Sequence, residues 1–120
     1  MATLDGRKIL VVEDEMIAMR NMEFVLENLG CLAIFPVSSV LQAFTLLAIE
    51  NFDLAILDVN LGKENSYPIA DLLIARGIPF AFSTGYLNHG ARTDLNSHLV
   101  LRKPYLAGDV ALVVDQLLAR

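Results

Sequence analysis

Short apolar runs alternate along this chain with longer stretches in which apolar residues recur every third or fourth position. A short run rich in β-branched and aromatic residues is typical of a strand, and the longer period is typical of an amphipathic helix. The short runs predict strands at residues 7–12, 32–36, 53–58, 78–83 and 99–102. The periodic stretches predict helices at residues 15–29, from Ser38 or Ser39 to about 50, 68–77 and 109–120, with a weaker helical pattern at 88–96.

Strands that alternate with helices in this way form a parallel sheet with helices on both faces. The continuous apolar run at residues 54–57 fits a strand that is buried on both sides. We therefore expect an α/β fold with a doubly wound, five-stranded parallel sheet. A length of 120 residues, 55% of them hydrophobic, predicts a single domain over residues 1–120.

Chemically reactive side chains stand at the ends of four predicted strands. The acidic run 13–15 follows the first strand, Asp58 ends the third, Thr84 follows the fourth, and Lys103 follows the fifth. Each of these alone is compatible with a helix cap or a turn. Because the carboxyl ends of parallel strands meet at one sheet edge, their joint occurrence indicates a single site.

Clustered carboxylates repel one another unless a cation offsets their charge. A hard cation such as Mg²⁺, or alternatively Mn²⁺, prefers oxygen ligands and keeps several waters. We expect Asp14, Asp58 and the backbone carbonyl of Asn60 to bind the metal directly, with Glu13 acting through water. Lys103 would hold a phosphate oxygen, the Thr84 hydroxyl would donate to another, and Asp58 would be the nucleophile that accepts a phosphoryl group.

These residues resemble the receiver domain of a two-component response regulator, and the resemblance covers essentially the whole chain. Val11-Val12-Glu13-Asp14-Glu15 matches the acidic pair of that family, Leu57-Asp58 the phosphorylated aspartate, Thr84 the switch hydroxyl, and Lys103-Pro104 the lysine with its following proline. The resemblance implies strand order 2-1-3-4-5, five flanking helices and a cis Lys103–Pro104 peptide. It also implies a bacterial phosphoprotein that works through an aspartyl phosphate in phosphorelay signalling.

Two positions depart from the usual pattern of this family. Val100 stands where most receivers carry an aromatic residue, and Thr84 is followed by Gly85 and Tyr86. The string 79–86 resembles an atypical receiver subgroup with a Phe-Ala-Thr-Gly-Tyr-like signature, often linked to HWE-class histidine kinases. We therefore hypothesise that the loop after Thr84 moves on phosphorylation, with Tyr86 or residues 88–96 replacing the missing aromatic.

The expected partners are a sensor histidine kinase, with the HWE class as a candidate, or a histidine phosphotransfer protein, together with a downstream protein. As a single-domain receiver, the chain is expected to switch a protein-binding surface and to catalyse no reaction beyond its own phosphorylation and dephosphorylation. We expect a monomer or weak dimer. We expect it in the cytoplasm, because no segment reads as a signal peptide or membrane helix. A net charge of −5 argues against nucleic-acid binding, and a single cysteine, Cys31, argues against disulfides and zinc clusters.

Three other functions compete with this interpretation. A phosphorylation-independent pseudo-receiver would bind partners through the same fold. A phosphatase of the haloacid-dehalogenase type needs a second aspartate where this chain has Asn60. A nucleotide- or flavin-binding module needs a glycine-rich loop after the first strand, where this chain carries acids instead.

Overall fold

The computed structural model describes residues 4–85, 90 and 92–119. In this part of the chain, parallel strands form a five-stranded sheet with the order β2-β1-β3-β6-β7. The strands are β1 (Lys8–Val12), β2 (Ala33–Val37), β3 (Leu54–Asp58), β6 (Phe80–Thr84) and β7 (Leu99–Arg102). Counted along the chain, this is the predicted order 2-1-3-4-5, so the doubly wound α/β fold is confirmed.

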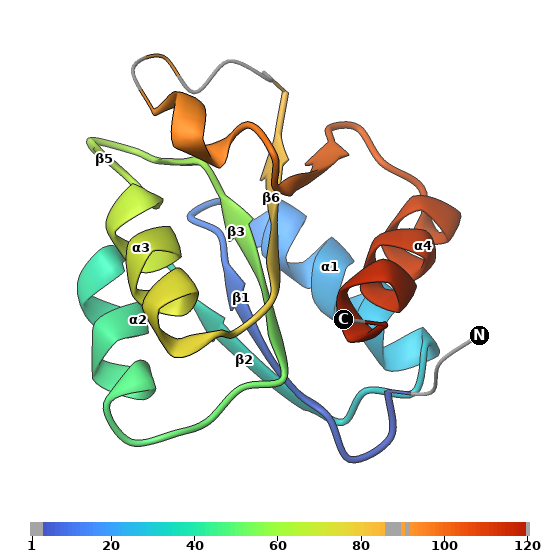
Figure 1. The fold of residues 1–120 in the computed structure, drawn as a ribbon. Helices are drawn as coiled ribbons and strands as arrows, with labels where there is room; N and C mark the ends of the chain where they lie inside the picture. The colour runs from blue at the N-terminus through green and yellow to red at the C-terminus, as the bar shows by residue number, and fades with distance from the viewer. Residues whose placement is uncertain (1–3, 86–89, 91, 120) are drawn as a thin grey trace.

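Helices cover both faces of the sheet (Figure 1). Helices α1 (Met16–Asn28) and α4 (Ala107–Leu118) lie on one face, and α2 (Val40–Leu47) and α3 (Tyr67–Arg76) lie on the other. Alternate strand residues serve the two faces, as the pleat of a strand requires. Ile9, Val11, Ile56, Ala81 and Leu101 pack with α1 and α4, and Leu10, Val12, Leu57, Phe80 and Phe82 pack with α2 and α3.

The expectation of five flanking helices needs correction. The described residues contain four α-helices and one short 3₁₀ helix, η1 (Thr93–Leu95), where residues 88–96 had a weak helical pattern. Gly90 has a φ of 59°, a left-handed conformation that does not continue an α-helix. Residues 86–89 and 91, which include Tyr86, lie outside the described part.

A small hairpin follows β3, in a stretch where the sequence patterns predict neither strand nor helix. Strands β4 (Asn60–Leu61) and β5 (Glu64–Asn65) pair antiparallel around a two-residue turn. Gly62 opens this turn with a φ of 76°, a conformation that glycine adopts without strain. The turn places Gly62 beside the site, because a Cβ added there would lie 3.7 Å from the Asp14 carboxylate.

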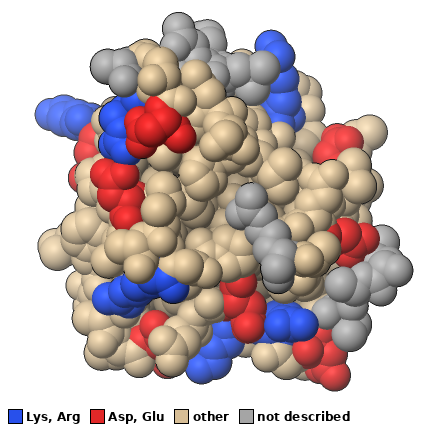
Figure 2. All heavy atoms as spheres, in the orientation of Figure 1, with Lys and Arg blue, Asp and Glu red and all other residues tan. Residues whose placement is uncertain are grey.

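The charged surface is mixed in sign. Figure 2 shows acidic and basic side chains interspersed over the face that it presents. Such a surface differs from the continuous basic stripe of most nucleic-acid-binding domains. Among the described residues, none of the helices has the length and apolar character needed to cross a membrane.

Candidate functional site

The predicted site residues meet at the carboxyl edge of the sheet. Asp58 and Thr84 end β3 and β6, Glu13 directly follows β1, and Lys103 directly follows β7. By strand alternation, Glu13, Asp58 and Lys103 continue the series of residues that faces α1 and α4. Topology therefore brings together side chains that are up to 90 positions apart in sequence.

Three carboxylates form the acidic part of this site. Glu13, Asp14 and Asp58 each place one carboxylate oxygen within 4.8 Å of the others. Glu13 and Asp58 are both 6% exposed, whereas Asp14 is exposed at the mouth of the site. Oxygens on opposite sides of a bound Mg²⁺ lie about 4 Å apart, so this donor set fits a hard divalent cation with little rearrangement.

Lys103 supplies the positive charge of the site. Its Nζ lies 2.9 Å from Oε1 of Glu13 and 3.5 Å from Oδ2 of Asp58. Its backbone N–H donates to the carbonyl of Thr84 at 2.9 Å, which continues the ladder between β7 and β6 beyond the strand end. The lysine side chain therefore reaches from the edge strand β7 across β6 and β3 to the acids.

The environment shifts the pKa values of these groups in different directions. Burial raises the pKa of Asp58 to about 7, and the adjacent Glu13 carboxylate adds to the rise, while Lys103 opposes it. Burial also acts to raise the pKa of Glu13, but hydrogen bonds with Asp58 and Lys103 outweigh it and lower that pKa. Burial acts to lower the pKa of Lys103, but Glu13 and Asp58 outweigh it and raise that pKa.

These shifts favour a protonated Asp58 beside an ionised Glu13 at pH values below about 7. One lysine offsets only part of the charge of three neighbouring carboxylates. A divalent cation at the cluster would supply the missing positive charge and favour full ionisation of Asp58.

The hairpin after β3 controls the direction of the Asn60 carbonyl. Ser66 donates its backbone N–H to the carbonyl of Val59 at 3.0 Å, so Val59 and Ser66 form a hydrogen-bonded pair. Hydrogen-bonded and non-bonded pairs alternate along an antiparallel ladder, which makes Asn60 and Asn65 a non-bonded pair. The Asn60 carbonyl is therefore directed away from β5 and left available as a ligand, as the predicted metal site requires.

Thr84 and Val100 occupy the positions expected for the switch elements of the site. Thr84 is 3% exposed at the end of β6 and pairs in register with Arg102. Val100 is half-buried on β7 and packs toward the cluster under α2 and α3, where an aromatic side chain is missing.

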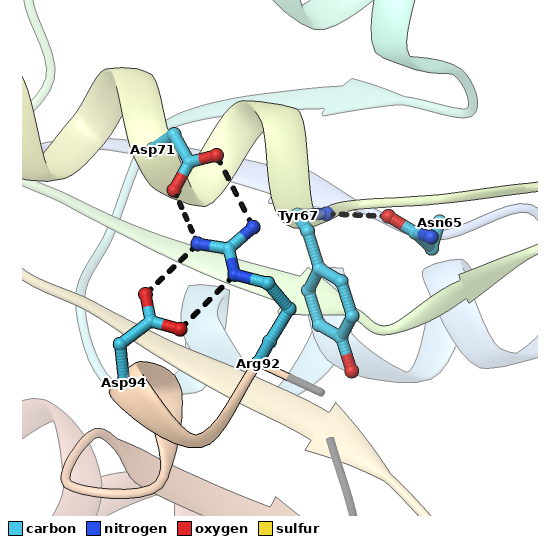
Figure 3. A network of polar contacts seen from close by, with 5 residues as sticks. All are labelled: Asn65, Tyr67, Asp71, Arg92 and Asp94. Atoms are coloured by element: carbon cyan, nitrogen blue, oxygen red, sulfur yellow. Dashed lines mark hydrogen bonds and ion pairs between the residues drawn. The ribbon is translucent and has the colours of Figure 1, made fainter. Parts of the chain in front are cut away.

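A polar network beside this site has no counterpart in the sequence predictions (Figure 3). Arg92, just before η1, donates to both oxygens of Asp71 on α3, at 2.7 and 3.3 Å, and to both oxygens of Asp94. Its guanidinium also lies 5.6 Å from the centre of the Tyr67 ring. The network joins η1 to α3. Asp71 lies 21 positions before Arg92 in the sequence, so no local motif marks their contact.

Cysteine and histidine can carry chemistry, but the two described residues of these types outside the site lie in packed surroundings. Cys31 is fully buried. His98 stacks on Phe80 with ring centres 4.6 Å apart, which is a packing contact. His89 lies outside the described residues.

Comparisons with known proteins agree with this geometry. Residues 9–104 match the sequence model of the response regulator receiver domain. The chain is 29% identical over 104 residues to the sensory transduction protein LytR of Streptococcus agalactiae, which covers 82% of this chain. The chain spans only 42% of the length of that relative.

Solved structures extend the likeness over the whole chain. SdrG from Sphingomonas melonis Fr1 is 38% identical, with a TM-score of 0.82 over 98% of this chain and 99% of that one. A BeF3-activated conformation of SdrG from Pseudomonas melonis Fr1 gives a TM-score of 0.79 at 38% identity, over the same shares of both chains.

A more distant structure shows the same fold with a metal. The receiver domain of sensor histidine kinase PA1611 from Pseudomonas aeruginosa PAO1 has magnesium in its active-site cleft. It is 22% identical, with a TM-score of 0.82 over 96% of this chain and 99% of that one. From the match to residues 9–104 and the full-length likeness to SdrG, we conclude that this chain belongs to the response regulator receiver domain family of two-component signalling.

Proposed function

We propose that Asp58 accepts a phosphoryl group from a histidine kinase or a histidine phosphotransfer protein, and that its phosphorylation switches a protein-binding surface. One observation carries this proposal. The buried Asp58 carboxyl group lies beside Glu13 and Asp14 and 3.5 Å from the Lys103 ammonium, at the carboxyl edge of a parallel sheet. That arrangement combines a nucleophile, metal ligands and a fixed positive charge at one point.

Asp14, Asp58 and the Asn60 carbonyl would hold Mg²⁺ or Mn²⁺, with Glu13 acting through a water molecule. The metal would offset the charge that develops on the phosphoryl group during transfer. The exposure of Asp14 and the magnesium bound by the PA1611 receiver both support this assignment.

The residues of the chain have distinct roles in the transfer. An oxygen of the Asp58 carboxylate forms the new bond to phosphorus as the bond between phosphorus and the donor histidine nitrogen breaks. Lys103 leaves its contact with Glu13 to pair with a phosphoryl oxygen, and the Thr84 hydroxyl donates to another. The low exposure of Asp58 and Thr84 limits the access of water to the acyl phosphate.

The structural change that follows phosphorylation would pass through Thr84 toward η1. Val100 lacks the aromatic ring that would report the change in most receivers. SdrG, which is similar over the whole chain, has a BeF3-activated conformation. The Arg92 contacts with Asp71 and Asp94 anchor η1 at the far end of the segment that begins at Thr84. We expect this region, with β7 and α4, to be the surface that a downstream protein reads.

The proposed setting is cytoplasmic, with the chain acting as a monomer or weak dimer that turns over no separate substrate. An HWE-class kinase is the proposed upstream partner. It can be tested by measuring transfer from a purified, labelled HWE-class kinase against transfer from a kinase of another class.

The first test is intact mass spectrometry after incubation with Mg²⁺ and acetyl phosphate. Wild-type protein should gain one phosphoryl group, and Asp58→Ala should gain none, because the nucleophile is gone. Asp53→Ala is a matched control, since Asp53 directly precedes β3 but lies at its other end. If wild-type protein gains no phosphoryl group and binds no Mg²⁺, the phosphorylation-independent pseudo-receiver becomes the better description.

A further inference from the structure

Among the described residues, two buried hydroxyl groups have no hydrogen-bond partner. Ser66 is 0% exposed and Ser83 is 3% exposed, and the Oγ atom of each makes no hydrogen bond. Buried polar atoms in proteins are nearly always hydrogen-bonded, because leaving one unpaired is unfavourable. An unpaired hydroxyl beside a reaction site therefore calls for a partner that is present during the reaction.

Ser83 lies next to the phosphoacceptor on the neighbouring strand. It pairs in register with Asp58, and its carbonyl accepts a hydrogen bond from the N–H of Val59 at 3.3 Å. Neighbouring strands lie about 4.8 Å apart, so the two side chains are direct neighbours if they point to the same face.

Strand alternation places them on the same face. Ala81, two residues before Ser83, and Ile56, two residues before Asp58, both belong to the cluster under α1 and α4. Ser83 and Asp58 therefore face that side, and so does Lys103, two residues after Leu101. In the sheet, β6 lies between β3 and β7, and Ser83 pairs in register with Asp58 on one side and with Leu101, two residues before Lys103, on the other.

Ser66 is a natural comparison because its hydroxyl is also buried and unpaired but lies toward the other face of the sheet. It also adjoins Val59, through the hydrogen bond from its own N–H, but it begins α3 on the opposite face of the sheet. It thus shares with Ser83 a buried, unpaired hydroxyl without sharing the face of Asp58 and Lys103.

We propose that Ser83 is a positioning residue for phosphoryl transfer, whose Oγ turns from its unpaired position at rest to donate a hydrogen bond to Oδ2 of Asp58 when Mg²⁺ and the phosphodonor are bound. This inference rests on the proposed function of Asp58. Lys103 already lies 3.5 Å from Oδ2, so a second donor there fixes the plane of the carboxylate. The other carboxyl oxygen is then directed toward the incoming phosphorus, and a pre-oriented nucleophile reacts faster than a freely rotating one.

With acetyl phosphate as donor, the free oxygen of Asp58 forms the bond to phosphorus and the phosphorus–oxygen bond to acetate breaks. Acetate leaves with the bonding electron pair. The Ser83 proton stays on Ser83 and only gains a hydrogen-bond acceptor. No oxidant, reductant or further reactant takes part.

The test measures the rate of phosphorylation by acetyl phosphate at saturating Mg²⁺, using intact mass. Ser83→Ala should react about tenfold more slowly, because losing one hydrogen bond to a charged group raises the activation barrier by an amount that corresponds to a rate change of this size. Ser83→Thr and Ser83→Val have the same shape but differ in the hydroxyl. The threonine variant should keep a rate near that of wild type, and the valine variant should be as slow as Ser83→Ala. Ser66→Ala should react at the wild-type rate.

A second readout does not depend on turnover. Beryllofluoride with Mg²⁺ mimics the bound phosphoryl group and should raise the melting temperature of wild-type protein more than that of Ser83→Ala or Ser83→Val. Mg²⁺ alone should still bind every variant, because Ser83 is not a metal ligand.

Equal phosphorylation rates in wild type, Ser83→Ala and Ser83→Val would overturn the role of Ser83 while leaving Asp58 as the phosphoacceptor. Equal loss of rate in Ser83→Thr and Ser83→Val would also overturn it, because packing rather than the hydroxyl would then decide the rate. If wild-type protein itself gains no phosphoryl group while Asp58→Ala is equally inert, the proposed function fails first, and the role of Ser83 with it.

Discussion

At the scale of single residues, the buried pair of Asp58 and Glu13 makes stability depend on pH. Burial and the Glu13 charge raise the pKa of Asp58 to about 7, whereas an aspartate in the unfolded chain titrates near about 3.9. Between these values the folded state binds more protons than the unfolded state, so stability falls as pH rises. The lowered pKa of Glu13 and the raised pKa of Lys103 act outside this window, at lower and higher pH.

We therefore expect metal-free wild-type protein to lose stability as pH rises from about 4 to about 7, and Asp58→Asn to lose much less. The asparagine keeps the shape and a donor for Glu13 but carries no charge, so at pH 8 it should be more stable by about 1–3 kcal/mol. Urea unfolding in EDTA at several pH values measures both slopes. Parallel slopes for the two proteins would show that Asp58 titrates normally.

At the scale of elements, sequence patterns predicted the three central strands, β1, β3 and β6, because each is a nearly continuous buried run. Residues 53–58 were predicted as the strand that ends at Asp58, and β3 is Leu54–Asp58, with every residue buried. Residues 109–120 were predicted to form most of the last helix, and α4 is Ala107–Leu118. The Asp109 carboxylate accepts a hydrogen bond from the Leu106 N–H at 2.8 Å, so it caps a helix that starts at Ala107.

The elements that sequence patterns missed are those fixed by contacts distant in sequence or by backbone conformation. The β4–β5 hairpin depends on the positive φ of Gly62 and has strands too short to show alternation. The contact between Arg92 and Asp71 anchors η1, and these residues are too far apart in sequence to form a recognisable local pattern. Both features border the site, where local propensity is a weak guide.

The Arg92 network gives a prediction at this scale. Arg92→Ala should speed hydrogen exchange at the amides of Thr93–Leu95, because η1 loses its contacts with α3, and should leave the amides of β1 and β3 unchanged. The effect should shrink in high salt, which screens exposed ion pairs. Arg20→Ala, at an exposed arginine on α1 across the sheet, is the control. Unchanged exchange in η1 would show that packing of the buried Leu95 anchors the turn by itself.

At the scale of the whole molecule, the site was predictable because a parallel sheet gathers the carboxyl ends of its strands at one edge. The acids, Asp58, Thr84 and Lys103 were each ambiguous alone, and the topology of five strands made them one constellation. Sequence alone could not give the directions of the groups within it. The outward turn of the Asn60 carbonyl and the placement of Ser83 beside Asp58 both follow from ladder geometry that only the fold fixes.

The last prediction concerns stability and metal binding together. Because Mg²⁺ should bind the folded acidic cluster and not the unfolded chain, it should stabilise the protein at pH 8 by about 2.7 kcal/mol when its concentration is a hundred times the Kd. Asp14→Asn should abolish this gain without unfolding the protein, since Asp14 is exposed. Glu15→Gln removes the same charge from the next residue, which is exposed and outside the group of three. It should keep the gain, and thermal unfolding across a Mg²⁺ titration would compare the three proteins directly. An equal gain in all three would mean that Mg²⁺ acts by screening the net charge of −5 rather than by binding this site.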